Sequence, residues 1–248
     1  MHSRTSLRKA VTISKIKNFQ RRDNMNVLIA CEESQTITIE MRKLGHQAFS
    51  CDLQEPSGGH PEWHVKGDVS DILHSPATFL AMDGTKYEGI TWDLIIAHPP
   101  CTYLSSVANR MHSKKSRTIS QINDRTVTRL EAMKFFLGFA YVNCPKICIE
   151  NPVGIMNTAY RKPDQIIHPY YFGDPNLKRT CLWLYGLPPL DYSSTIIERP
   201  QPIRIGCNGK NVYFTEHCGG SDRARVRSRT FPGIARAMAR QWAGEANV

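Results

Sequence analysis

The sequence predicts an α/β fold: a mostly parallel, Rossmann-like sheet with helices on both of its faces. Runs of apolar residues at 27–30, 94–97 and 147–149 have the length and continuity of strands that are buried on both sides. Each run ends abruptly in polar residues or prolines, and helical patterns follow the first two. At 248 residues, a single domain can bury a full hydrophobic core.

The first predicted unit is a strand at 26–31, the turn Glu32–Ser34 and a helix that ends at Gly45. Ser34 is the predicted N-cap, and glycine is favoured just after a helix. The next strand ends in Asp52. This order is typical of a nucleotide-binding half-fold, in which the acid accepts hydrogen bonds from ribose hydroxyls, although the turn contains no glycine.

A short third strand near Val65 leads to Gly67 and Asp68. Asp68 is placed either to contact the amino group of an adenine or to cap the following helical turn. The segment by itself favours the cap.

The strand at 94–97 stops at Pro99 and Pro100, because proline cannot donate to a sheet ladder. Cys101 is therefore expected on a stiff turn at the carboxyl edge of the sheet, where ligands bind in open α/β folds. The prolines are expected to direct His98 away from the thiol. The strand at 146–149 ends in the same way, in Glu150, Asn151 and Pro152, so that Cys101 and Glu150 are predicted to share a pocket.

The polar stretch 105–125 has no helical pattern, and we expect a lid. Its basic side chains would close over a nucleic-acid backbone: Arg110, Lys114, Lys115 and Arg117. A helix over 127–143 follows, with one apolar face formed by Leu130, Met133, Phe136, Leu137 and Ala140.

We divide the chain into a basic, flexible extension (1–24), a catalytic core (25–186), a small irregular insertion that is a possible target-recognition segment (187–221), and a C-terminal helix that packs back on the core (222–248). A strand pair is expected at 168–172 and 180–185. Residues 1–24 are interpreted as a nucleic-acid-binding arm, a transit-like peptide or a translated leader that precedes Met25.

The net charge is +10, of which residues 1–24 contribute +6. A second basic cluster consists of Arg223, Arg225, Arg227 and Arg229. Clustered positive charge is typical of a polyanion partner and equally of a solvated surface. No apolar run approaches the roughly 18 residues that span a membrane, and the first 24 residues lack the apolar core of a secretory signal, so a cytoplasmic protein is expected.

Eight cysteines are present. Four of them lie in apolar, strand-like runs, which favours reduced, buried thiols over disulfides: Cys31, Cys51, Cys148 and Cys181. A zinc site is the weaker alternative, because the spacings Cys144–Cys148 and Cys207–His217–Cys218 do not fit one.

A cysteine opposite a carboxylate has three interpretations. It is a structural thiol, the nucleophile of a hydrolase that would need a nearby histidine, or the nucleophile that attacks carbon 6 of a pyrimidine. Thiolate addition at carbon 6 turns carbon 5 into a nucleophile toward an electrophilic methyl group. A protonated carboxyl at ring nitrogen 3 favours that addition.

Several ordered motifs carry a resemblance. They are Ala-Cys-Glu at 30–32, His-Pro-Pro-Cys-Thr-Tyr-Leu at 98–104, Ile-Glu-Asn-Pro at 149–152, Thr-Cys-Leu-Trp-Leu at 180–184 and Pro-Gly-Ile-Ala-Arg-Ala-Met-Ala at 232–239. The chain resembles the DNA cytosine-5 methyltransferases from about residue 25 to 242, and more specifically the short enzymes of this family in phages and prophages.

The resemblance implies that Cys101 is the nucleophile and that Glu150 holds and protonates the cytosine, with Pro100, Ser105 and Asn151 completing the catalytic site. It implies S-adenosylmethionine as the cofactor, bound by Cys31, Glu32, Ser34, Asp52, Asp68 and Pro99. Lys178 and Arg179 correspond to a basic, DNA-contacting element of the family. Further implications are double-stranded DNA with a flipped cytosine as the partner, a monomer, and the cytoplasm of a bacterial host. The alternatives are the same chemistry on RNA or a free nucleotide, and an inactive nucleic-acid-binding relative.

Overall fold

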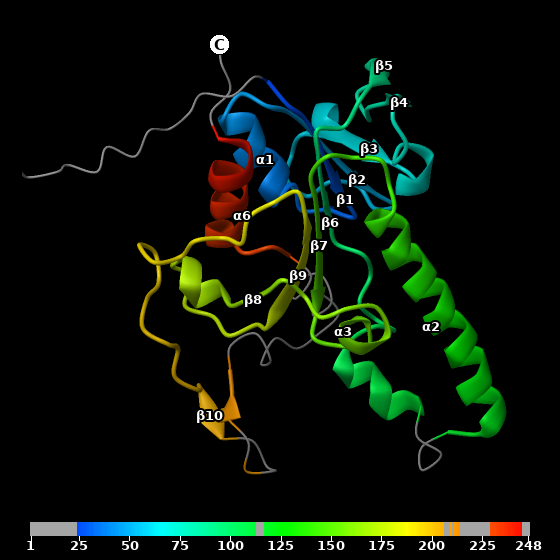
Figure 1. The fold of residues 1–248 in the computed structure, drawn as a ribbon, viewed down its shortest axis with the longest axis vertical. Coiled ribbons are helices and arrows are strands. Elements are labelled where there is room, and N and C mark those ends of the chain that lie inside the picture. The colour runs from blue at the N-terminus through cyan, green and yellow to red at the C-terminus, as the bar shows by residue number, and fades with distance from the viewer. Residues whose placement is uncertain (1–23, 113–116, 206–208, 210, 214–228, 245–248) are drawn as a thin grey trace, which may run out of the picture.

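A seven-stranded sheet forms the centre of the protein, in the order β3-β2-β1-β6-β7-β9-β8 (Figure 1). The structure, a computed structural model, describes residues 24–112, 117–205, 209, 211–213 and 229–244. The strands are β1 (Asn26–Ala30), β2 (Gln47–Asp52), β3 (His64–Lys66), β6 (Leu94–Ala97), β7 (Ile147–Pro152), β8 (Gln165–Ile167) and β9 (Thr180–Tyr185). Strands β3, β2, β1, β6 and β7 are parallel, and β9 runs antiparallel to β7 and β8. The predicted α/β class with a mostly parallel sheet is confirmed.

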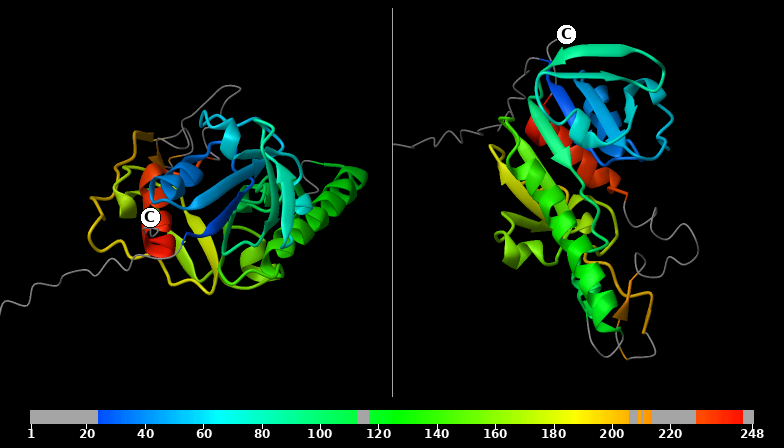
Figure 2. Two further views of the ribbon diagram at one scale, coloured as in Figure 1. Left: turned by 90° about the horizontal axis from the view of Figure 1, so that it is seen from above. Right: turned by 90° about the vertical axis from the view of Figure 1, so that its right-hand side faces the viewer.

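Helices cover both faces of this sheet (Figure 2). On one face lie α1 (Thr36–Lys43) and α6 (Pro232–Met238), which continues as the π-helical turn η5 (Ala239–Ala243). The other face carries α2 (Ile119–Ala140). Two buried clusters result, one around Ile37, Met41 and Trp242 and the other around Phe136, Phe139 and Trp183. Alternate residues of each strand enter opposite clusters, as the pleat of a sheet buried on both sides requires.

Short elements complete the described chain. The hairpin of β4 (Ala77–Leu80) and β5 (Lys86–Ile90) packs Phe79 and Tyr87 on Phe49, and the second hairpin consists of β10 (Arg204–Ile205) and β11 (Asn211–Val212). The remaining elements are α3 (Met156–Ala159) and the 3-10 turns η1 (Pro61–Trp63), η2 (Val69–Asp71), η3 (Ser106–His112) and η4 (Pro169–Phe172). No helix in the described ranges is long and apolar enough to cross a membrane.

The expectation of an unpatterned stretch over 105–125 is wrong. Part of it is η3, and α2 begins at Ile119 rather than at 127. A capping box fixes this start, because the Thr118 hydroxyl accepts from the Gln121 backbone N–H while the Gln121 side chain accepts from Thr118 N–H. The first part of α2 extends past the ends of the strands (Figure 1), and Leu130, at the middle of the helix, is 58% exposed rather than part of a buried face.

The strand predicted at 168–172 is also wrong. Residues 169–172 form the 3-10 turn η4, and the edge strand β8 lies just before it. Pro169 occupies the first turn and Gly173, with a φ of 89°, ends it, so the backbone turns away from the sheet.

The predicted insertion begins as part of the core. The Gln165 side chain exchanges two hydrogen bonds with the Leu190 backbone, and the Gln241 side chain does the same with Asp191. The segment that follows β9 is thus fixed both to β8 and to the C-terminal helix. Residues 214–221 lie outside the described part, so the boundary at 221 stays a prediction.

Candidate functional site

The strand order reverses between β1 and β6, since β2 and β3 lie on one side of this pair and β7 on the other. At such a switch point the loops that follow the two strands diverge and leave a crevice at the carboxyl edge, where ligands bind in this class of fold. The loop after β1 contains Cys31 and Glu32, and the loop after β6 contains His98 and Cys101. The two halves of the predicted site therefore meet at this edge.

The turn after β1 manages without glycine. Cys31 (φ 60°) and Gln35 (φ 56°) both adopt the left-handed conformation that usually favours glycine. Two backbone N–H groups, of Cys31 and Glu32, donate to the Cys51 carbonyl at 2.7 and 3.2 Å. The Gln35 side chain donates to the Ser50 hydroxyl and the His60 carbonyl and accepts from His60 N–H, which holds the loop after β2 against the turn. Side-chain hydrogen bonds thus stabilise a backbone that a glycine would adopt freely.

Glu32, rather than the predicted Ser34, caps helix α1. Its carboxylate accepts from the backbone N–H groups of Ile37 (2.7 Å) and Thr38 (3.3 Å) and from the Thr38 hydroxyl (2.7 Å). Burial raises the pKa of this carboxyl, while the charge of His98 and these hydrogen bonds act in the opposite direction. An internal carboxylate therefore occupies the helix terminus that would otherwise attract a phosphate.

Acidic groups gather beside this turn. Burial and then the nearby Asp52, Cys51 and Asp68 raise the pKa of the Cys31 thiol, so Cys31 is a neutral thiol close to both predicted adenosine contacts. Asp52 ends β2, and its carboxylate accepts from the Gln54 backbone N–H. Asp68 caps η2 by accepting from Ser70 N–H at 2.9 Å, which confirms the cap. Its contact with an adenine stays a prediction.

The loop that carries Cys101 is tied to the end of β7. The buried Asn151 amide donates to the Pro99 carbonyl at 2.7 Å, Ser106 N–H donates to the Val153 carbonyl, and Ile155 N–H donates to the Leu104 carbonyl. A β-bridge joins Ser105 to Gly154. The two motifs, 50 residues apart in the chain, are thus one structural unit, and a pocket shared by Cys101 and Glu150 stays a prediction.

Cys101 is the exposed member of the six cysteines that the structure describes, all of which are reduced. Burial raises the pKa of the Cys51 thiol to about 12 and that of Cys148 well above its ordinary value. Buried neutral thiols are poor nucleophiles, whereas an accessible thiol on a rigid turn can reach a ligand. Cys207 and Cys218 lie outside the described residues.

Glu150 is surrounded by cationic and hydroxyl groups. Its Oε2 lies 2.9 Å from His98 Nδ1, and Lys178 and Thr180 also face it. Burial by itself would raise the pKa of this carboxyl. The hydrogen bond from His98 and the charge of Lys178 outweigh burial and lower the pKa, so Glu150 is ionised at neutral pH in the free protein. The sequence had directed His98 elsewhere, and Lys178 was assigned to a nucleic acid rather than to this carboxylate.

Two arginines of α2 hold the segment just after Cys101. Arg129 Nε donates to the Tyr103 carbonyl at 3.0 Å, its Nη2 donates to the Asn109 side chain, and the Arg125 guanidinium lies 4.7 Å from the centre of the Tyr103 ring. The nearby Arg129, Arg125 and Arg117, after burial, lower the pKa of His112. No ion pair within the described ranges joins Arg125 or Arg129 to a carboxylate.

Arg117, a predicted nucleic-acid contact, thus lies near His112 together with Arg125 and Arg129. Arg125 and Arg129 are four residues apart, so they lie on the same side of a helix. They could have been predicted as nucleic-acid contacts if the start of α2 had been recognised. Lys178 is half-buried and Arg179 exposed, at the same edge of the sheet. The side chain of Arg110 and residues 113–116, which include Lys114 and Lys115, lie outside the described part.

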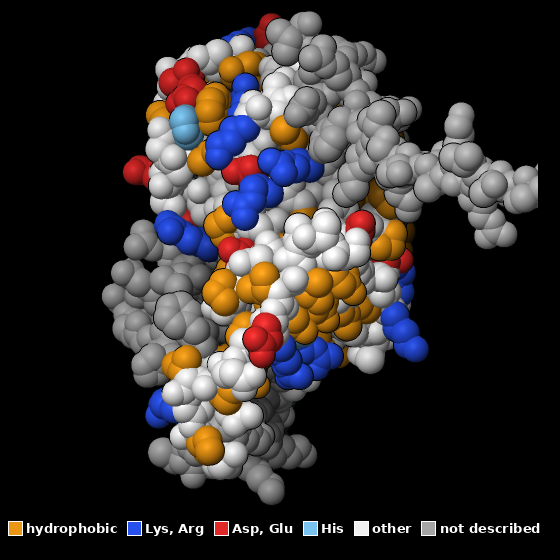
Figure 3. Space-filling model, turned by 90° about the vertical axis from the view of Figure 1, so that its left-hand side faces the viewer, with side chains coloured by type: hydrophobic (Ala, Val, Ile, Leu, Met, Phe, Trp, Pro, Cys, Tyr) orange, Lys and Arg blue, Asp and Glu red, His pale blue; other side chains and the backbone are white. Residues whose placement is uncertain are grey.

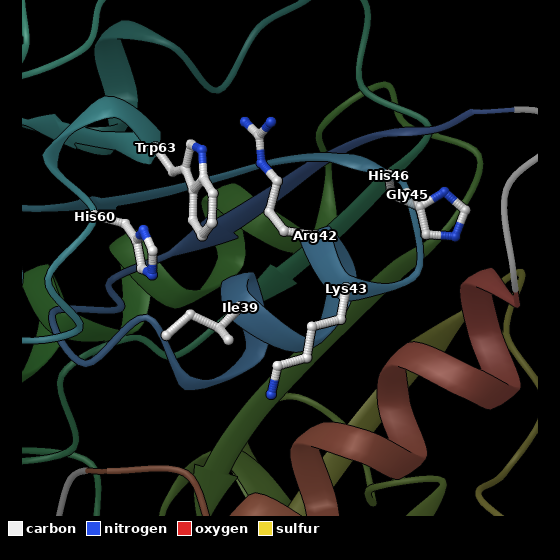
Figure 4. A pocket seen from close by; sticks show the side chains of 7 residues that line it. All are labelled: Ile39, Arg42, Lys43, Gly45, His46, His60 and Trp63. Carbon is white, nitrogen blue, oxygen red and sulfur yellow. The ribbon is translucent and has the colours of Figure 1, made fainter. Parts of the chain in front are cut away.

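A pocket of about 480 Å³ lies elsewhere, on the outer side of α1 (Figure 4). The His60 and Trp63 rings stack there at 3.8 Å, and the Arg42 guanidinium lies 5.1 Å from the Trp63 ring. None of the predicted site residues lines it, and its Lys43 and His60 are paired with Glu40 and Glu62. Figure 3 shows Lys and Arg side chains interspersed with acids on the face of α1 and α6, as on an ordinary solvated surface.

No group of three or more side chains that could hold a metal ion occurs among the described residues. No family model matches the chain. No curated protein matches it either. Among solved structures, that of the Dnmt2 methyltransferase of S. pombe matches with a TM-score of 0.40 and 15% sequence identity, over 67% of this chain and 50% of that one. The chain thus spans about half the length of that protein, and the activity has to be argued from the site.

Proposed function

We propose that the chain is an S-adenosylmethionine-dependent DNA cytosine-5 methyltransferase. One observation carries the proposal: the single exposed thiol of the described chain stands on a turn that is locked to the strand end bearing the ionised Glu150. Attack on carbon 6 of a pyrimidine requires this pair, with a carboxyl at the edge of the ring and a thiolate at its face. A cysteine hydrolase is disfavoured, because its base would hydrogen-bond the thiol through the ring nitrogen that faces away from the carboxylate. In His98 that nitrogen, Nε2, is buried and has no hydrogen-bond partner in the described part of the chain.

In the proposed reaction, the Cys101 thiolate forms a bond to carbon 6 and the ring accepts a proton at nitrogen 3 from Glu150. Carbon 5 would then take the methyl group, with the electrons of the broken bond going to the sulfur of the donor. Loss of the carbon 5 proton to water, return of the nitrogen 3 proton to Glu150 and release of the thiolate restore the ring. Asn151 keeps the Pro99 turn, and with it the thiol, in place. Since Glu150 is ionised in the free protein, it has to take up a proton before it can give one to the base.

The residues after β1 and β2 fit the proposed cofactor. S-adenosylmethionine supplies an electrophilic methyl group on a positively charged sulfur, and its nucleoside has ribose hydroxyls and an adenine amino group. The acidic side chains of Glu32, Asp52 and Asp68 suit a cation and hydrogen-bond donors. A dinucleotide with its pyrophosphate fits poorly, because the Glu32 carboxylate already accepts from the first N–H groups of α1. Cys31, Ser34 and Pro99 are the remaining proposed contacts.

A nucleic acid is favoured over a free nucleotide as the substrate. Arg125 and Arg129 stand beside the loop that bears the thiol, without a carboxylate partner among the described side chains, and Arg179 is exposed at the same edge. A free nucleotide presents few phosphates, whereas a strand presents one at every residue. The base would leave the stack to reach the thiol.

The test is a trapping experiment with duplex DNA that contains 5-fluorocytosine, which cannot lose its carbon 5 substituent. In the presence of S-adenosylmethionine, the wild type should form a covalent adduct stable to denaturation. Cys101→Ser should form none, and Cys144→Ser, the matched control, should react as the wild type does because Cys144 is half-buried with its thiol engaged by backbone carbonyls. Calorimetric titration with the cofactor gives an independent readout.

The substrate arms separate the alternatives. Equal trapping on single-stranded RNA or on free 5-fluorodeoxycytidine would assign the chemistry to another pyrimidine substrate. DNA binding that is indifferent to S-adenosylmethionine and to Cys101 would identify an inactive binding protein. Absence of an adduct on all three substrates would overturn the proposed mechanism.

A further inference from the structure

We propose that His98 is a positioning residue that holds Glu150 and supplies its proton. The inference rests on the proposed function and adds a residue that pyrimidine chemistry does not by itself require. Three observations carry it: the 2.9 Å contact of His98 Nδ1 with Glu150, the buried Nε2 without a described partner, and the position of the ring between two carboxylates.

The contact fixes where the proton lies. An ionised carboxylate only accepts hydrogen bonds, so Nδ1 carries the hydrogen and points it at Oε2 of Glu150. The His98 side chain is 9% exposed and that of Glu150 14%, so the hydrogen bond is shielded from water. Such a bond fixes the plane of the carboxylate and decides which oxygen is left for the base.

The second nitrogen restricts how the ring exchanges protons. His98 Nε2 is buried and has no hydrogen-bond partner in the described part of the chain. With Nε2 shut off from solvent, protons enter and leave the imidazole through Nδ1 and therefore through Glu150. In the proposal, His98 therefore exchanges protons with Glu150, and through Glu150 with the reacting base.

The charges around the pair are consistent with this role. The charge of His98 acts to lower the pKa of two carboxyl groups, that of Glu32 just after β1 and that of Glu150 near the end of β7. The charge of Lys178, just before β9, and a hydrogen bond with Thr180, the first residue of β9, also act on Glu150. His98 lies on the loop between these elements, and its backbone N–H donates to the Ala30 carbonyl of β1.

The proposed step is balanced in charge and atoms. As the bond between Cys101 sulfur and carbon 6 forms, the electrons of the ring double bond shift toward nitrogen 3. The imidazolium form of His98 gives its Nδ1 proton to the ionised Glu150, and Glu150 passes a proton to nitrogen 3. The negative charge of the thiolate and the positive charge of the imidazolium disappear together, and the proton returns along the same path when the thiolate leaves.

Two substitutions separate this role from a structural one. The amide nitrogen of His98→Asn lies as many bonds from Cα as Nδ1 does, so it can still donate to Glu150, but it cannot supply a proton. The amide of His98→Gln lies at the distance of Nε2 and loses the contact. His60→Gln is the matched control, since His60 Nδ1 makes an equal 2.9 Å contact with Glu62 away from the thiol.

Adduct formation on 5-fluorocytosine duplex should be followed in single turnovers between about pH 5 and 9. At saturating S-adenosylmethionine, we expect His98→Gln to slow it about 10- to 100-fold, the factor for one lost hydrogen bond to a charged group. His98→Asn restores the hydrogen bond but not the supply of a proton, so it should recover only part of that loss and stay slower than the wild type. The pH profile of the rate should differ between the wild type and both variants, because only the wild type has a ring that can pass a proton to Glu150. A wild-type rate and pH profile in His98→Gln would overturn the proposal, as would a His98→Asn no faster than His98→Gln.

A second readout does not depend on activity. In protein labelled with ¹³C-glutamate, the carboxyl signal that disappears in Glu150→Gln should titrate below the ordinary range. The pKa should move upward in His98→Gln and stay low in His98→Asn. If the wild type forms no adduct but this titration follows the expectation, the methyltransferase assignment fails and the His98–Glu150 pair stands. An unmoved Glu150 pKa in His98→Gln refutes the pair itself.

Discussion

Gly154→Ala tests the connection between the two halves of the catalytic site. Gly154 follows the Glu150 strand and lies against the backbone of the Cys101 loop. An added Cβ would lie 2.8 Å from the Leu104 carbonyl carbon and 2.9 Å from Ser105 Cα, with the Leu104 oxygen nearer still. All three are backbone atoms, so no side chain can rotate away. Alanine must separate the loop from β7 by roughly 1 Å or more to restore normal contacts.

That separation breaks specific hydrogen bonds. The bond from Ile155 N–H to the Leu104 carbonyl (2.8 Å) and that from Ser106 N–H to the Val153 carbonyl (2.9 Å) both cross the junction. Two hydrogen bonds at about 1 kcal/mol each, with an overpacking cost of about 1–3 kcal/mol, predict a loss of roughly 3–5 kcal/mol in the free energy of unfolding. Displacing a nucleophile by about 1 Å costs about 100-fold in rate.

Urea denaturation and the rate of adduct formation on 5-fluorocytosine duplex measure the two effects. Gly138→Ala in α2 is the matched control, because nothing lies within 4 Å of its Cβ position, and replacing a helical glycine should stabilise the protein by about 1 kcal/mol. If Gly154→Ala retains wild-type stability and rate, the junction does not hold the thiol and the argument fails.

Three further predictions concern the surroundings of the site. Arg125→Ala and Arg129→Ala should weaken DNA binding, and each should reduce the dependence of the binding constant on salt by about one phosphate contact. Lys86→Ala, on the β4–β5 hairpin, is the control and should change neither quantity. Titrations with DNA at several salt concentrations measure both. Asn151→Ala should lower the free energy of unfolding, measured in urea, by about 1–3 kcal/mol and slow adduct formation, because it removes the hydrogen bond from the buried Asn151 amide to the Pro99 carbonyl. A variant as stable as the wild type contradicts this prediction. Burial lowers the pKa of His64, so below about pH 6.5 the unfolded chain binds a proton that the folded chain does not. The free energy of unfolding should therefore fall as the pH is lowered toward the pKa of His64 in the folded protein. His64→Gln should reduce this pH dependence in denaturation experiments at pH 5 to 7.

The sheet could be predicted because its strands are buried on both faces. Such strands are continuous apolar runs, and the polar or proline residues at their ends mark the carboxyl edge. The β4–β5 hairpin was missed because only one side of it is buried. In β4, for example, the Ala77 side chain is buried and the Leu80 side chain is exposed. The start of α2 was missed because the first turns extend beyond the sheet and have no apolar face, although the capping pair Thr118 and Gln121 was present in the sequence.

The candidate site divides in the same way. Cys101 and Glu150 were predicted together because both lie near the carboxyl ends of parallel strands, and parallel strands end at one edge. The strand end itself was placed too early, since β7 continues through Glu150 to Pro152, paired with β9. The partner of Glu150 could not be predicted, since the direction of His98 depends on how the Pro99 turn is bound by Asn151. The cap on α1 was misassigned to Ser34 because a helix cap is normally local, whereas Glu32 reaches across its turn to Ile37 and Thr38.

These contacts place one histidine between the two halves of the site. Glu32 belongs to the turn proposed to hold the methyl donor and Glu150 to the strand proposed to hold the base, and the charge of His98 acts on both. A positively charged ligand beside Glu32 would neutralise part of the negative charge that acts on His98. The imidazolium form of His98 would then be less stabilised, and its proton would pass more readily to Glu150. Cofactor binding should therefore raise the pKa of Glu150, which is the change that proton transfer to the base requires. Titration of the ¹³C-labelled Glu150 carboxyl with and without S-adenosylmethionine measures this coupling, and an identical pKa in both would show that the two halves act independently.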